Sequence, residues 1–218
     1  MEQNKEFAGT HQQGPIGQIE KAYIKAQDVM TTPQVKAFIA GEEEANSRAM
    51  FGSDQFSQNC LVAYRLAKTG VPFVALQTGG WDMHDNCVGG MEKQVPSVDA
   101  GFGGLVAALT ASGLLDTTLV MIGGEFGRTP SLNGGQGRDH HGYGSWALAG
   151  GGIRGGIAYG DSGKDGTSNR ENVTVGDVWH TIFALCGIDA KKSYMVEGRR
   201  IAYAYKDVNG VPIRAVMA

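Results

Sequence analysis

The pattern of hydrophobic positions becomes regular after residue 50 and alternates between helical and β-type spacing. Apolar residues recur every three or four positions in three segments, which predict helices over 53–70, 95–113 and 174–187. Short apolar runs predict strands over 71–76, 117–122 and 145–149, with weaker strand signals at 157–159 and within 201–216. The run at 117–122 is apolar almost throughout, which predicts a strand buried on both faces. Helices alternating with strands in this way indicate a layered α/β fold.

The first 50 residues are polar and show only weak hydrophobic periodicity. Short helices are predicted over 19–29 and 35–40, and the acidic run at 41–44 is predicted to be solvated surface. His11 stands alone in a segment rich in Gln and Gly, so we expect it to be exposed. The chain therefore divides into a polar, partly helical segment, 1–50, and a folded region, 51–218, that carries the chemistry.

Composition excludes several classes of protein. The net charge of −3 and the lack of a dense Lys/Arg run give no basis for binding nucleic acid. No apolar run approaches the ~20 residues that a membrane span needs, and the first residues contain no apolar core of a secretory signal. The 34 glycines concentrate between 79 and 166, among apolar residues, and predict tight turns rather than a disordered linker.

The three cysteines lie far apart and form no C-x-x-C pair, which argues against a disulfide framework or a thiolate zinc site. Cys60 and Cys186 fall in apolar helical patterns and are predicted to be core residues. Cys87 lies close to a candidate site, but its simplest interpretation is also structural.

A first polar cluster follows the predicted strand at 71–76. Asp82 and His84 are separated by one residue, so in an extended segment their side chains leave on the same side. A carboxylate and an imidazole that point together suit a divalent cation such as zinc or manganese. The alternative is a simple hydrogen-bonded pair.

A second cluster follows the strand predicted at 117–122. Glu125 comes directly after this strand, where an unpaired carboxylate would be costly. One interpretation is an ion pair with Arg128. The other makes Glu125 a metal ligand and leaves Arg128 to bind an anion through two parallel hydrogen bonds.

A third cluster consists of three consecutive ionisable residues, Asp139, His140 and His141, in a glycine-rich segment. Core packing does not explain such a run. It is either a solvated loop or part of a metal site shared with the other two clusters. His180, by contrast, lies in the middle of a predicted helix beside Trp179 and is predicted to be structural.

Taken together, the motifs resemble a known family. The segments Gly79-Gly80-Trp81-Asp82-x-His84, Gly124–Pro130 and Gly137–His140 occur in the same order as in a sulfatase-like bacterial domain family of unassigned function, which is placed in the alkaline phosphatase superfamily. The resemblance covers roughly residues 50 to 216. It implies a layered α/β fold with a mostly parallel central sheet flanked by helices, and hydrolysis of sulfate or phosphate esters at one or two metal ions.

The resemblance also implies roles for individual residues. Asp82 and His84 correspond to the carboxylate–histidine pair of a first metal ion, with His140 or His141 as its third ligand. Glu125 occupies the place of an Asp-His pair that binds a second metal ion, but Phe126 replaces the histidine, so Asp139 is the substitute candidate. Arg128 would bind the non-bridging oxygens of the ester.

The same resemblance leads to expectations about the whole protein. Superfamily members place a nucleophile and an Asp ligand in a first strand–helix unit that residues 1–50 do not show, so the chain is expected to be the C-terminal half of a longer protein, or a shortened homologue. Relatives often carry an export signal, which suggests an extracytoplasmic protein. The leading hypothesis is a metal-dependent hydrolase of small anionic esters that uses zinc, manganese or calcium. The alternatives are a non-catalytic, metal-stabilised domain and an anion-binding module, and self-association is expected if a sheet edge is exposed.

Overall fold

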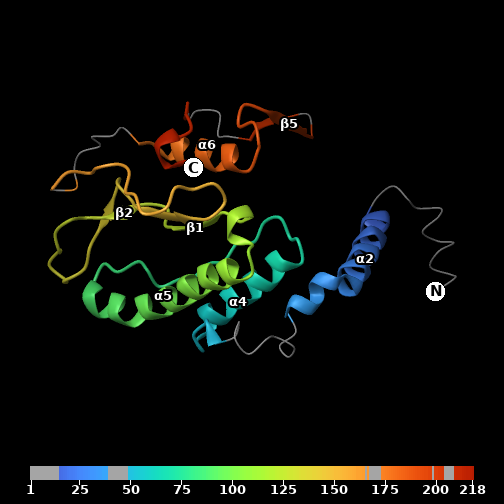
Figure 1. Ribbon diagram of the computed structural model, residues 1–218, viewed down its shortest axis with the longest axis horizontal. Helices are drawn as coiled ribbons and strands as arrows, with labels where there is room; N and C mark the ends of the chain where they lie inside the picture. Colours follow the sequence, from blue (N-terminus) through green and yellow to red (C-terminus); the bar gives the residue numbers. More distant parts are fainter. Residues whose placement is uncertain (1–14, 39–48, 165, 167–172, 198, 204–208) are drawn as a thin grey trace.

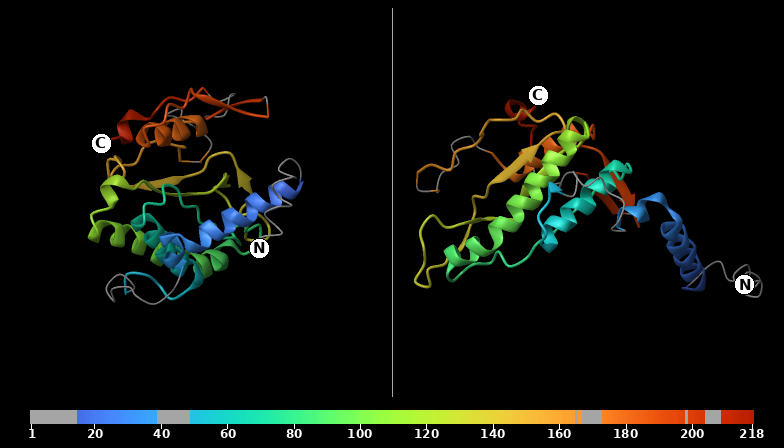
Figure 2. Two further views of the ribbon diagram at one scale, coloured as in Figure 1. Left: turned by 90° about the vertical axis from the view of Figure 1, so that its right-hand side faces the viewer. Right: turned by 60° about the horizontal axis from the view of Figure 1, so that its bottom comes forward.

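The computed structural model describes residues 15–38, 49–164, 166, 173–197, 199–203 and 209–218. Figure 1 shows helices and short strands stacked in layers, with helix α2 (Pro15–Thr31) at one end of the molecule. Helices α4 (Gln55–Lys68) and α5 (Cys87–Ala111) form one layer, the central strands lie above them, and helix α6 (Val175–Leu185) covers the other side. Figure 2 shows the same three layers from the side.

The strands do not form the parallel sheet that the sequence and the family resemblance led us to expect. Within the described residues they form three separate antiparallel pairs. Strand β1 (Val120–Gly123) pairs with β4 (Trp146–Ala149), β2 (Gly127–Arg128) with β3 (His140–His141), and β5 (Ser193–Val196) with β6 (Arg199–Ala202). The prediction of a mostly parallel central sheet is therefore wrong for the described part of the chain.

Two of the predicted strands are missing because no neighbouring strand among the described residues pairs with them. The apolar run at 71–76 has the composition of a strand but is irregular, and Phe73 in it is exposed. β-Branched and aromatic residues favour a strand only where a neighbouring strand accepts its backbone hydrogen bonds, and no described strand lies in register with this run. Residues 157–159, also predicted as a strand, are irregular too.

The strand predicted at 117–122 is shifted in the structure. A short 3₁₀ helix, η2 (Leu115–Thr117), takes up its start, and β1 begins at Val120. Val120 is buried and the next residue, Met121, is exposed, so β1 is buried on one face rather than two. The strand predicted at 145–149 is confirmed as β4.

The predicted helices are confirmed, with one change of boundary. α4 begins after Asp54, whose side chain accepts a hydrogen bond from the Ser57 backbone N–H. α5 begins at Cys87, eight residues before the predicted start, and Pro96 lies inside it. The predicted start assumed that Pro96 lies in the first turn, where proline is commonest in helices. The helix instead begins further upstream, where Asn86 caps it.

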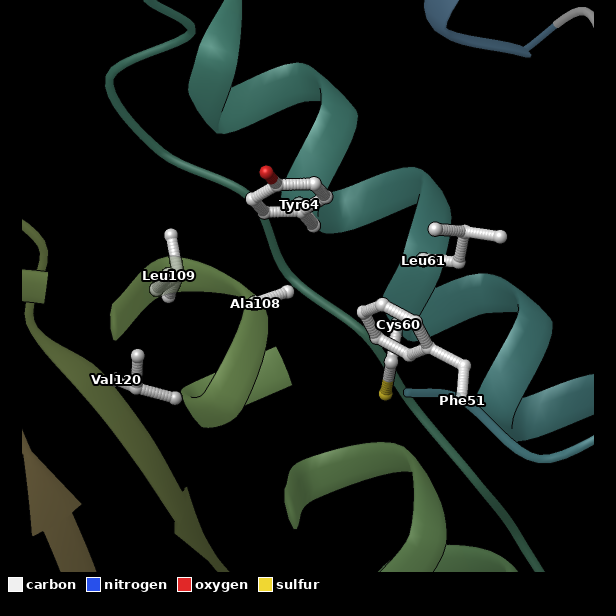
Figure 3. Packing of buried hydrophobic residues seen from close by; sticks show 7 residues of the cluster. All are labelled: Phe51, Cys60, Leu61, Tyr64, Ala108, Leu109 and Val120. Atoms are coloured by element: carbon white, nitrogen blue, oxygen red, sulfur yellow. The ribbon is translucent and has the colours of Figure 1, made fainter. Parts of the chain in front are cut away.

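The hydrophobic core lies between α4, α5 and β1 (Figure 3). Cys60 and Tyr64 of α4 pack with Ala108 and Leu109 of α5, and Val120 of β1 completes the cluster. Burial raises the pKa of the Cys60 thiol to about 11, which keeps it protonated and unreactive. Cys60 is thus a core residue as predicted, and Cys87 is buried as well.

Helix α6 is fixed at its start by a capping box, in which Thr174 and Asp177 bond each other's backbone N–H groups. Its buried Thr181 side chain donates to the carbonyl of Asp177 and accepts the backbone N–H of Ile213, which ties the tail to the helix. The prediction that Cys186 is a core residue is wrong, since its side chain is exposed at the C-cap position, where α6 ends.

The remaining elements lie at the two ends of the chain. The helix predicted at 19–29 is confirmed as part of α2, and a 3₁₀ helix, η1 (Pro33–Phe38), covers most of the second predicted helix. A last 3₁₀ helix, η3 (Arg214–Val216), closes the tail, and among the described residues of 201–216 only β6 overlaps the predicted strand. His11 and residues 41–44 lie outside the described residues. No described helix combines the length and the apolar content needed to cross a membrane.

Candidate metal centre

The structure brings the first and third polar clusters together. Asp82 and His84 lie in the irregular segment before α5, and His140 lies in β3. The Nε2 atoms of His84 and His140 are 3.3 Å apart, and the Oδ1 atom of Asp82 is 3.1 Å from the first and 3.0 Å from the second. The three atoms therefore form a compact triangle with one possible ligand atom from each residue.

This triangle has the dimensions of a metal site. In a tetrahedral zinc site with Zn–N and Zn–O distances near 2.0–2.2 Å, neighbouring ligand atoms lie about 3.3 Å apart. The observed separations are within a few tenths of an ångström of this value. Asp82, His84 and His140 are thus close enough to hold a metal ion in common.

The protonation of His84 strengthens this interpretation. Its Nδ1 atom lies 2.8 Å from Oδ1 of Asp139, so Nδ1 carries the proton and donates it to the carboxylate. In the neutral ring Nε2 then carries a lone pair, and that lone pair faces the carboxylate oxygen of Asp82 at 3.1 Å. Two acceptors at this distance need a proton or a cation between them.

Asp139 is thus placed behind the triangle rather than within it. A carboxylate that accepts the second N–H of a ligating histidine fixes the ring and its tautomer in many metal sites. Asn133 supports this carboxylate, since its Nδ2 donates to Asp139 at 3.1 Å and to the backbone carbonyl of His84 at 2.9 Å. Hydrogen bonds from the side chains of His84 and Asn133 lower the pKa of Asp139, which keeps it ionised.

Arg128 lies on the other side of the triangle, in β2. Its Nη2 atom donates to Oδ1 of Asp82 at 2.7 Å and to the carbonyl of Trp81 at 3.2 Å, and its Nη1 donates to the carbonyl of Arg138 at 3.0 Å. The hydrogen bond from Arg128, followed by the one from His140, lowers the pKa of Asp82 to about 2. Arg128 therefore keeps Asp82 charged and links three segments of the site.

Phe126 orients the third ligand. Its ring lies 4.1 Å from the ring of His140, centroid to centroid, and the guanidinium of Arg128 lies 5.5 Å from the same aromatic ring. In the sequence, Phe126 stands out only as a departure from the superfamily pattern. Sequence reasoning missed Asn133 altogether, although an Asn followed by two glycines is a turn signal that points to a side chain bonded to its own loop.

Two predicted ligands lie elsewhere. Glu125 is exposed, and within the described residues it forms neither an ion pair nor a hydrogen bond, so the ion pair with Arg128, one of its two interpretations, is not formed. His141 follows His140 in β3, and successive side chains of a strand point to opposite faces. Its Nδ1 accepts the backbone N–H of Tyr143 at 3.4 Å, away from the triangle. Of the two histidines, His140 is the one that joins Asp82 and His84.

The comparisons with known proteins identify a family but no function. No curated protein and no solved structure matches the chain. Residues 1–217 match a family described as "Protein of unknown function (DUF1501)". Because the match spans almost the whole chain, the protein belongs to the DUF1501 family.

Proposed function

We propose that this protein binds one divalent cation through Asp82, His84 and His140 and acts as a hydrolase of sulfate or phosphate esters. The observation that carries the metal site is the triangle of ligand atoms, each 3.0–3.3 Å from the others. Two imidazoles and one carboxylate suit zinc or manganese, whereas calcium prefers a shell made of oxygen atoms.

The proposed reaction rests on the motifs. The segments Gly79–His84, Gly124–Pro130 and Gly137–His140 resemble those of a sulfatase-like family in the alkaline phosphatase superfamily, and the first and third of them supply the triangle. A bound divalent cation would supply a Lewis acid for the ester oxygen. The protein's own part is to hold that cation in place: Asp139 orients His84, Phe126 packs on His140, and Arg128 keeps Asp82 ionised.

A second candidate function is a metal-binding domain without turnover. It is favoured by the contacts of Arg128, because both Nη atoms donate to groups of the site itself, namely Asp82 and the carbonyls of Trp81 and Arg138. An arginine used in this way stabilises the site more than it binds a substrate. This candidate predicts that a chelator lowers the melting temperature while no ester is hydrolysed.

Elemental mass spectrometry of the purified protein tests the metal site, and a screen of aryl sulfates and phosphates tests the reaction. We expect about one equivalent of zinc or manganese, its loss in Asp82→Ala, and its retention in the matched control His180→Ala, whose histidine lies in α6 outside the triangle. Metal with ester turnover supports the hydrolase, and metal without turnover supports the second candidate. A folded protein that takes up no metal from zinc- and manganese-containing buffer would overturn both.

A further inference from the structure

A polar cavity lies beside the β2–β3 pair, lined in part by residues of both strands. It has a volume of about 420 Å³, within the range of small-molecule sites. Its polar lining residues are Arg128, His141, Tyr143, Ser145, Ser162 and Lys164. None of its lining residues belongs to the triangle of Asp82, His84 and His140.

Strand β3 contributes one histidine to the triangle and one to the cavity, and Arg128 of β2 contacts both. His140 pairs with Arg128 and His141 with Gly127 in the antiparallel register. Since side chains alternate between the faces of a strand, His140 joins the triangle while His141 lines the cavity. His141 accepts the backbone N–H of Tyr143 at Nδ1, so the neutral ring carries its proton on Nε2 and is a hydrogen-bond donor.

The chemistry of the lining favours an anion. The residues that line the cavity include two cationic side chains, Arg128 and Lys164, and no Asp or Glu. The charge of Arg128 is balanced by Asp82 at 2.7 Å. Among the described residues, no ion pair is formed by Lys164. Three other lining residues, Tyr143, Ser145 and Ser162, carry hydroxyl groups that can donate hydrogen bonds.

Two glycines bring the walls of the cavity together. A Cβ on Gly127 would lie 1.6 Å from the carbonyl oxygen of Tyr143, so β2 contacts the segment after β3 through its backbone. Gly166 has a φ of +67°, and a Cβ there would lie 2.6 Å from Cγ of Pro130. Gly166 therefore lies close to Pro130, which follows β2 in the chain.

We propose that this cavity is a second binding site, which takes a tetrahedral oxyanion of the phosphate or sulfate class without the help of a metal ion. Lys164 supplies the charge, and the hydroxyls of Ser145 and Ser162 with the N–H of His141 supply directed hydrogen bonds. The anion is either free in solution or the charged group of a small organic molecule. This site goes beyond the proposed function, because it needs neither the triangle nor ester hydrolysis.

Isothermal titration calorimetry with inorganic phosphate, in the presence of EDTA, tests the proposal on the whole protein. We expect saturable binding that Lys164→Ala weakens about ten- to a hundredfold, the loss typical of a charge-assisted hydrogen bond, and that Lys164→Arg largely restores. Lys93→Ala removes an exposed lysine of α5 that does not line the cavity, and it should bind phosphate like the unmodified protein. Circular dichroism of each variant shows that it is folded.

A parallel titration with glycerol 2-phosphate, and with glycerol as its uncharged counterpart, separates the two sources of the anion. Tighter binding of the ester than of phosphate assigns the site to an organic molecule, and equal binding assigns it to the free anion. Both results support the site. Absence of saturable binding by either anion, or equal affinity in Lys164→Ala, would overturn it. Since EDTA removes divalent metal, failure of the proposed metal centre leaves this result unaffected.

Discussion

The side chains of His84 and Asp139 meet across 55 positions of the chain, with Nδ1 of His84 2.8 Å from Oδ1 of Asp139. This contact fixes which nitrogen of His84 faces Asp82 and His140. The consecutive residues Asp139 and His140 therefore have different roles. Asp139 supports the candidate metal centre, and His140 is placed to bind the metal.

Replacing Asp139 by Ala should weaken metal binding about 10–100-fold, because the ring of His84 loses its orienting acceptor. Asp139→Asn keeps an oxygen acceptor and should lose less. Competition with a metal-sensitive dye measures the affinity. The absorption spectrum of the Co²⁺-substituted protein shows whether Asp139 supports His84 or binds the metal itself. Unchanged bands in Asp139→Ala mean that the ligand set is intact. Shifted bands would show that Asp139 is itself a ligand.

His140 and His141 provide a matched pair on one strand. His140→Ala should abolish stoichiometric metal uptake, because His140 contributes one of the three ligand atoms. His141→Ala should retain the metal, because its side chain lies on the other face of β3. Elemental mass spectrometry of both variants decides the matter. Loss of metal in His141→Ala alone would reverse our assignment.

Gly137 controls the position of His84. A Cβ at this position would lie 1.9 Å from the carbonyl carbon of His84 and 2.4 Å from the amide nitrogen of Asp85, both of them backbone atoms that cannot move aside. Gly137→Ala should therefore displace His84 and reduce metal affinity at least tenfold, as misplaced supporting groups do. In the same loop, a Cβ on Gly134 would meet no heavy atom within 4 Å, so Gly134→Ala is the control and should bind metal normally. Equal affinities in the two variants would contradict this role of Gly137.

Asp54 links the start of α4 to α5 and makes the stability of this helix pair depend on pH. Hydrogen bonds from Ser57, and then from the Ser97 hydroxyl, lower the pKa of Asp54 from 3.8 to about 2. Because the pKa is lower in the folded state, the stabilisation is fully present above pH 3.8 and is lost as the pH falls toward 2.

The matching experiment compares urea denaturation of the unmodified protein and Asp54→Ala. Above pH 3.8 the variant should be less stable by about 0.5–2 kcal/mol, the usual contribution of a helix N-cap, and the difference should shrink as the pH approaches 2. Asp99→Asn, at an exposed position of α5, controls for general loss of negative charge. A difference that does not change with pH would contradict this role of Asp54.

Features that depend on residues close together in the sequence could be predicted, whereas features that depend on distant partners could not. α4 and α6 could be predicted because their periodicity lies within each helix and their caps, Asp54 and Thr174, directly precede them. The convergence of Asp82, His84 and His140 could be expected from polar clusters and a family resemblance. The arrangement of strands could not, since pairing of Val120 with Ala149 depends on partners that no local pattern specifies. For the same reason the sequence alone did not show which of His140 and His141 is the third candidate ligand. That assignment required the register of β3 with β2.

The ligands of the candidate centre are also far apart along the chain. Asp82 and His140 are separated by 58 positions, and the segment between them contains the whole of α5 and β1. A cation held by both residues would close this segment into a loop, as a covalent cross-link does, and would reduce the number of conformations open to the unfolded chain. Because α5 and β1 also supply Leu109 and Val120 to the hydrophobic core, metal binding and formation of the core would become a single cooperative event.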